Sequence, residues 1–140
     1  MGARSNATYP ASIPFTDSEA TAHLYGITYD VVSKAVDTTI TENESGKIIL
    51  STGDDKTMTL PSTATGLVYT FVVGATSTST GLSISPAAAD SIGGLGLTTV
   101  DDKDLINTQA TERVGDSVTL VSVAAGWLAI NASGTWAKEA

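Results

Sequence analysis

The stretch TLPSTATGLVYTFVV, residues 59–73, decides the fold class of this chain. From residue 67 onward, one face of an extended strand carries large apolar side chains, namely Leu67, Tyr69, Phe71 and Val73. The other face carries Val68 and Val72 on either side of Thr70, and a strand that is apolar on both faces is typical of one covered on both sides. The loop PSTATG at 61–66 therefore leads from an outer strand into a central one.

Short alternating segments, separated by turns of Gly, Ser, Thr and Asp, run through most of the remaining chain. They lie at residues 27–33, 36–41, 47–51, 56–60, 82–85, 114–123 and 127–131. Strands at this spacing predict an all-β fold, an antiparallel β-sandwich or barrel. In the last hairpin, Val121, Trp127 and Ile130 fall out of strict phase, which indicates a β-bulge or cover on both faces.

The first 35 residues differ from the strand-rich remainder. Residues 1–15 contain two prolines and no regular period, which predicts an extended N-terminal arm. In TDSEATAHLYG, residues 16–26, Thr16 and Glu19 fit a capping box and Gly26 a helix end, so a short helix is expected at 17–25. The predicted organisation is an arm at 1–15, a short helix with a connecting strand at 16–35, and a β-domain at 36–140.

Composition excludes several classes of protein. The chain has 7 basic and 15 acidic residues and a net charge of −8. Because its Lys and Arg residues are scattered singly, nucleic-acid binding is not expected. It has no Cys, hence no disulfide framework or thiolate metal site. No apolar run approaches the roughly 18 residues of a membrane span, and the N-terminus lacks the apolar centre of a signal peptide.

Acidic turns are the first candidates for a site: Asp54, Asp55, Asp101, Asp102 and Asp104. Clustered carboxylates can bind calcium or serve as a glycosidase pair. The DDKD at 101–104, however, lacks the alternation of a calcium loop and has a lysine inside it, and no aromatic-lined cleft is indicated. Solvated turn residues are the favoured interpretation, so no metal site is predicted.

No catalytic constellation can be assembled either. His23 is the only histidine, and no G-x-S-x-G stretch accompanies it. The glycine-rich segment PAAADSIGGLGL, residues 86–97, is expected to be a loop. Its Gly93, Gly94 and Gly96 indicate closely packed backbone, but no lysine follows them as in a phosphate loop. The sequence therefore predicts a protein that is not an enzyme and has no cofactor.

The order of short motifs between about 36 and 136 resembles a known family. SGK at 45–47 is followed by LP at 60–61, by Gly66 opening YTFVV, by DSIGG at 90–94 and by GDSVTLVSV at 115–123. A terminal W-x-x-x-x-x-x-G-x-W, residues 127–136, follows. The segment is similar to tailed-bacteriophage capsid decoration proteins, also called head cement proteins. The strand-LP-x-x-x-x-G-strand phrase also resembles repeats in phage tail and fibre proteins.

The resemblance implies a virion structural protein on the outer surface of the phage head, where it binds the major capsid protein as a homotrimer and stabilises the shell. It also implies that the N-terminal arm grips capsid subunits. The residues suited to that contact, by adding a strand to a capsid edge, are Tyr9, Pro10, Ile13, Pro14 and Phe15. The alternative is a tail-fibre or head-fibre module that binds a receptor or carbohydrate, which predicts exposed aromatics such as Trp136 at a loop end.

Overall fold

The computed structural model describes residues 28–140, and these form short strands and two single-turn 3₁₀ helices. The strands are β1 (Val31–Lys34), β2 (Thr38–Thr39), β3 (Ile48–Ser51), β4 (Thr57–Thr59), β5 (Val68–Val73), β6 (Ser83–Ser85), β7 (Ile92–Gly94), β8 (Leu105–Asn107), β9 (Ser117–Val123), β10 (Gly126–Ser133) and β11 (Trp136–Lys138). The 3₁₀ helices are η1 (Glu42–Glu44) and η2 (Gln109–Thr111). The predicted all-β class is confirmed for this part of the chain. The arm at 1–15 and the helix at 17–25 lie outside the described residues.

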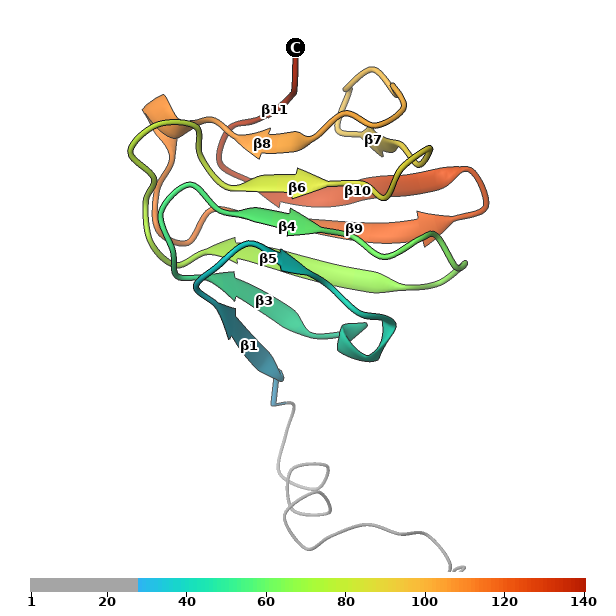
Figure 1. Ribbon diagram of the computed structural model, residues 1–140, viewed down its shortest axis with the longest axis horizontal. Helices are drawn as coiled ribbons and strands as arrows, with labels where there is room; N and C mark the ends of the chain where they lie inside the picture. The colour runs from blue at the N-terminus through green and yellow to red at the C-terminus, as the bar shows by residue number, and fades with distance from the viewer. Residues whose placement is uncertain (1–27) are drawn as a thin grey trace, which may run out of the picture.

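The strands form two mixed sheets (Figure 1). The six-stranded sheet has the order β1-β3-β5-β9-β10-β7, and the five-stranded sheet has the order β11-β8-β6-β4-β2. The antiparallel prediction is wrong for much of the fold, because β1, β3 and β5 pair in parallel, as do β2, β4 and β6, and β7 with β10. The β5–β9, β9–β10, β6–β8 and β8–β11 pairs are antiparallel.

The parallel pairs have a topological cause. Between residues 31 and 85 the chain enters the two sheets alternately, from β1 to β6. Because each strand is followed by one in the other sheet, the chain returns to the first sheet running in the same direction. Antiparallel pairing begins with β8, which pairs with β6, and continues with β9, which pairs with β5 and turns directly into β10. The first part of the described chain thus forms parallel strand pairs by alternating between the sheets, and the last part contains the β9–β10 hairpin.

The two sheets share one hydrophobic core. Buried residues from both belong to it, including Ile49 and Phe71 of the larger sheet and Met58 and Ile84 of the smaller. The Tyr69 ring lies 5.6 Å from the Trp127 ring, centroid to centroid, and 6.2 Å from the Phe71 ring. Burial of Tyr69, Phe71 and Val73 confirms the inner face expected for β5.

The other face of β5 departs from expectation. Val68, Thr70 and Val72 are half-buried rather than covered. Among residues 28–140 no further layer lies on this side of the six-stranded sheet. The expectation of burial on both faces is therefore not met within the described residues.

Two local predictions are refined. The glycine-rich segment expected to be a loop contains β7, which pairs with β10. Gly94, at φ +94°, is packed against the backbone of Ala129, as expected of a closely packed glycine. The irregularity of the last hairpin is a register shift between Ala129 and Asn131, which leaves Ile130 unpaired on β10 rather than a residue on β9. Among the described residues, no helix is long and apolar enough to span a membrane.

Candidate functional site

The acidic turn between β3 and β4 binds the chain's own backbone. Asp55 Oδ1 accepts hydrogen bonds from the amides of Thr80 (2.7 Å), Gly81 (3.0 Å) and Ser79 (3.3 Å). Asp54 accepts from the amide and hydroxyl of Thr78, at 2.7 and 2.9 Å. These bonds hold the pKa of Asp55 below its ordinary value, the amide of Gly81 contributing most. The paired carboxylates are turn residues, as expected, but they clamp the loop before β6 instead of being merely solvated.

Glu112 completes this clamp from the opposite side. It follows η2, is buried, and accepts hydrogen bonds from the amides of Ser77 and Leu82, the latter at 3.0 Å. The low-complexity loop 74–81 is thus held by Glu112 at Ser77 and at Leu82 just beyond its end, and by Asp54 and Asp55 between these two points. The sequence analysis overlooked Glu112, since a single glutamate forms no motif.

The second set of acidic residues, Asp101, Asp102 and Asp104, does not form a site. Asp101 and Asp102 are exposed, and Asp102 has a φ of +53°, as turn residues do. Asp104 lies near the C-terminal strand, where its carbonyl accepts from the Glu139 amide at 2.9 Å. Within residues 28–140, no group of three or more His, Asp or Glu side chains could hold a metal ion. The favoured interpretation of these residues as turn positions agrees with their placement.

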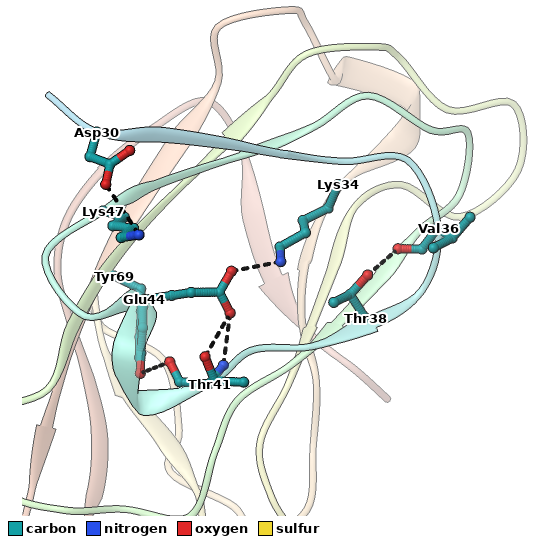
Figure 2. Close-up of polar contacts among 8 residues, drawn as sticks. All are labelled: Asp30, Lys34, Val36, Thr38, Thr41, Glu44, Lys47 and Tyr69. Carbon is teal, nitrogen blue, oxygen red and sulfur yellow. Dashed lines mark hydrogen bonds and ion pairs between the residues drawn. The ribbon is translucent and has the colours of Figure 1, made fainter.

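Lys34, Thr41, Glu44 and Tyr69 form a cluster of polar contacts at the β1 end of the core, here called the polar corner (Figure 2). Lys34 Nζ of β1 lies 2.6 Å from Glu44 Oε1 of η1, and both side chains are mostly buried. Glu44 Oε2 accepts hydrogen bonds from the amide and hydroxyl of Thr41, at 2.9 and 3.1 Å. The Tyr69 hydroxyl donates to the Thr41 carbonyl at 2.9 Å. Near the start of β1, Lys47 pairs with Asp30 at 3.1 Å.

Burial and neighbouring charges shift the pKa values of Glu44 and Tyr69 in this corner. Burial raises the pKa of Glu44, but the hydrogen bonds from Lys34 and Thr41 outweigh it, so the net pKa lies below the ordinary value. Burial, with the negative charges of Glu42 and Glu44, raises the pKa of Tyr69 to about 12. Each group is held in the protonation state that its partners require. The ion pairs and hydrogen bonds of this corner connect β1, η1 and β5.

The outer surface of the six-stranded sheet is mainly aliphatic, although Ser33, Ser117, Thr70 and Thr119 also lie at its outward positions. The register places one set of aliphatic side chains on this side, here called the aliphatic face: Val31, Ile48, Leu50, Val68, Val72, Val121 and Leu128. Val31 and Leu128 are 51% and 41% exposed, and the other five are half-buried. Thr70 and Thr119, in the middle, bond to each other at 2.9 Å between their hydroxyls. The outward strand positions of this sheet carry no charge.

The outer surface of the five-stranded sheet has a different chemistry. Its outward strand positions carry hydroxyl side chains, here called the hydroxyl face: Thr39, Thr57, Thr59, Ser83 and Ser85. Ile106 and Ala137 extend this row on the β8–β11 side. A polar outer face is the usual condition of a sheet that meets water. The aliphatic face is therefore the unusual one of the two.

Further apolar side chains are exposed near β1. Tyr29, just before this strand, is 69% exposed, and Val36, just after it, is 66% exposed. Within residues 28–140, β1 is also an edge strand (Figure 1). Exposed apolar groups beside an unpaired strand edge are characteristic of a surface that takes a partner.

The residues predicted for capsid contact, and the single histidine, for which no catalytic role was predicted, are not placed by the described structure. Tyr9, Pro10, Ile13, Pro14, Phe15 and His23 lie outside the described residues. Trp136, the aromatic named for a fibre-like binding site, packs partly buried against the core and donates its indole N–H to the Ser133 carbonyl at 2.9 Å. The sequence analysis missed the aliphatic face as a surface, although the alternation in β5 and β9 contained its signal.

A scan against protein-family models finds no match to this chain, and a search of the curated proteins also finds none.

Proposed function

We propose that this protein is a virion structural subunit that binds the outer surface of a phage head as a homotrimer and stabilises the shell. In this proposal its two sheets form a β-sandwich, and its direct partner is the major capsid protein. It has no catalytic role and no cofactor.

The observation that carries the proposal is the contrast between the two outer faces. Leaving the aliphatic outward positions of a sheet in water costs about 25 cal/mol for each Å² of uncovered apolar surface. The hydroxyl face shows that the same chain can place Thr and Ser outward. An aliphatic outer face therefore favours a subunit that is covered in its working state, which is what an assembly protein requires.

The motif order between 36 and 136 supports the choice of assembly, because it resembles phage head decoration proteins. The stabilisation would be thermodynamic: a ligand that binds only the assembled shell lowers its free energy by RT ln(1 + [L]/Kd), about 2.7 kcal/mol at a hundredfold excess over Kd. A trimer that engages several capsid subunits at once multiplies weak contacts through effective concentration.

The test is co-sedimentation of the purified protein with phage shells that lack it, counting the copies bound per shell. We expect saturation at a fixed number that matches the three-fold positions, together with a higher melting temperature of the decorated shell. A folded protein that leaves the shells undecorated would overturn the proposal. A few copies at one particle vertex would instead favour the head-fibre or tail-fibre alternative.

A further inference from the structure

The free edge of β1 lies at the start of a series of parallel strands whose offsets differ, with 22 positions (70 minus 48) between β3 and β5. From β1 to β6 the chain alternates between the sheets, and each return adds a parallel strand to the one before. Val31 lies opposite Ile48, so β1 and β3 are offset by 17 positions (48 minus 31). The connection between them, residues 35–47, has 13 residues (47 minus 34). This first turn supplies a length and an offset against which the preceding sequence can be compared.

The backbone of β1 has bonding groups on both sides. The Asp30 carbonyl accepts from the Ile48 amide at 2.9 Å, and the Lys34 carbonyl accepts from the Thr52 amide at 2.9 Å. Because alternate residues of a parallel strand bond to opposite neighbours, Val31 and Ser33 direct their amides and carbonyls away from β3. Within residues 28–140 no strand pairs with that outer edge.

The inner row of side chains also stops at β1. Val32 lies opposite Ile49, Ile49 opposite Phe71, and Phe71 opposite Val118. The last three are fully buried, whereas Val32, at the end of the row, is half-buried. One more apolar side chain beside Val32 would complete the row and cover it.

The sequence one turn earlier has the required pattern. Moving back from β1 by the same 17 positions reaches SIPFT, residues 12–16, and places Phe15 opposite Val32 and Ile13 opposite Asp30. Both large apolar side chains then fall on the inner side. The connection from Thr16 to Val31 has 14 residues (30 minus 16), close to the 13 of the first described turn.

Pro14 favours the register with Phe15 opposite Val32 over a register shifted by one residue. With Phe15 opposite Val32, the backbone of Phe15 bonds toward β1, while the position of Pro14 faces solvent. Its missing N–H then costs no hydrogen bond, and a proline on the outer side of an edge strand prevents further strand addition. A slip of one residue would turn Pro14 toward β1 and move Phe15 to the outer face.

We propose that residues 12–16 dock on the free edge of β1 of the same chain as a parallel strand, in the register that places Phe15 beside Val32. In this docking the Ser33 amide donates to the Phe15 carbonyl, and the Phe15 amide donates to the Val31 carbonyl. The proposal stands independently of the proposed function. It assigns Ile13, Pro14 and Phe15 to the protein's own fold, and leaves Tyr9 and Pro10 as the arm residues available to a shell.

Engineered disulfides test the register directly, because the chain has no cysteine of its own. Thr16 and Ser33 lie opposite each other in the proposed pairing, and adjacent strands bring Cα atoms within the 4.4–6.8 Å that a disulfide spans. The matched control joins Thr16 to Leu50, one strand further away on the same face. We expect Thr16→Cys/Ser33→Cys to close within one chain in a glutathione buffer in which Thr16→Cys/Leu50→Cys stays reduced. Equal closure of both pairs, closure of neither, or a disulfide-linked dimer would overturn the docking in cis, the dimer indicating exchange of the segment between copies.

Hydrogen exchange gives a second readout that needs no cysteine. In the full chain the Ser33 amide is expected to be at least tenfold more protected than after removal of residues 1–16. The Ile48 amide, which bonds to Asp30, should change little and serves as the internal control. Equal exchange of Ser33 in the two proteins would show that its amide has no partner in residues 1–16 and would overturn the proposal.

Discussion

Tyr69 joins the aromatic core to the polar corner at the β1 end. Its ring is fully buried against Trp127 and Phe71, while its hydroxyl donates to the Thr41 carbonyl at 2.9 Å. Burial and the nearby carboxylates of Glu42 and Glu44 favour the neutral phenol. One residue thus links β5 to the segment that precedes η1.

The pKa of Tyr69 predicts an alkaline transition. Its folded value, about 12, lies above the ordinary 10.0, so the folded state keeps the proton longer than the unfolded chain. The stabilisation is complete below pH 10 and is lost as the pH rises toward 12. Tyr69→Phe should cost about 1 kcal/mol at pH 7 through the lost hydrogen bond, and should weaken the loss of stability between pH 10 and 12. Urea unfolding of both proteins across this range checks the prediction. An unchanged alkaline slope would contradict it.

Two glycines with similar backbone conformations separate strain from steric overlap. Gly134 has a φ of +90°, and a Cβ added there would overlap the Asp116 carboxylate, which is buried and accepts from the Arg113 amide at 3.0 Å. Gly46 has a φ of +86° and no heavy atom within 4 Å of an added Cβ.

We therefore expect Gly46→Ala to cost about 1–2 kcal/mol, the penalty of a left-handed conformation alone. Gly134→Ala should cost more, since the Asp116 carboxylate or the turn must move. Chemical unfolding of the two variants gives the comparison. Equal losses would show that the β10–β11 turn accommodates the methyl group.

At the scale of elements, the carboxylate clamp orders a loop that its sequence leaves undetermined. The segment GATSTSTG at 74–81 has no apolar anchor, yet Glu112, Asp54 and Asp55 accept hydrogen bonds from its amides or from the amide of Leu82 that follows. The loop connects β5 of one sheet to β6 of the other, so the clamp orders a crossover between the two sheets.

The carboxylate clamp, through Asp55, and the polar corner, through Glu44, both predict that the folded state loses stability in acid. The folded pKa of Asp55 is lowered from 3.8 and that of Glu44 from 4.5, so their stabilisation is present above these values and is lost as the pH falls through the lower folded pKa values. Asp55→Asn should lower the urea midpoint at pH 7 and reduce its decline below pH 4. Asparagine also tolerates the φ of +50° found at this position. Asp101→Asn, in an exposed turn, is the matched control, and an equal effect of the two substitutions would refute the clamp.

Strands whose side chains alternate between apolar and polar could be predicted from the sequence, whereas β7 could not. Strands β3, β4, β5, β6 and β9 were expected nearly where they occur, because alternation records the inner and outer faces of each strand. β7 was expected to be a loop, since IGG has almost no side chains to alternate and is a strand only because it pairs with β10. The parallel pairing was missed because alternation is the same in parallel and antiparallel strands.

At the scale of the whole molecule, the aliphatic face predicts that the protein self-associates and that this face forms the interface of the proposed trimer. Val72 lies outward in central strand β5, and Thr59 lies outward on the opposite sheet. Val72→Lys should weaken self-association at least tenfold, which corresponds to about 1.4 kcal/mol, because burying an unpaired ammonium is costly. Thr59→Lys is the matched control and should associate like the wild type.

Analytical ultracentrifugation of the three proteins measures this effect. Circular dichroism confirms that each variant is folded. A wild type that is monomeric at all concentrations would contradict the trimer, whereas a trimer unaffected by Val72→Lys would place its interface elsewhere.

The sequence by itself determined the class of this protein and the two faces of its strands, because side-chain alternation and turn residues are local properties. It also predicted that the acidic pairs lie in turns. Only the tertiary structure decided which sheet each strand joins, the direction of each pairing, and which carboxylates accept hydrogen bonds from a loop more than twenty residues away. Those features depend on contacts between segments distant in the chain. The alternation of β5 records an outer face that is aliphatic, but only the packing of the sheets shows that this face stays outward on the molecule.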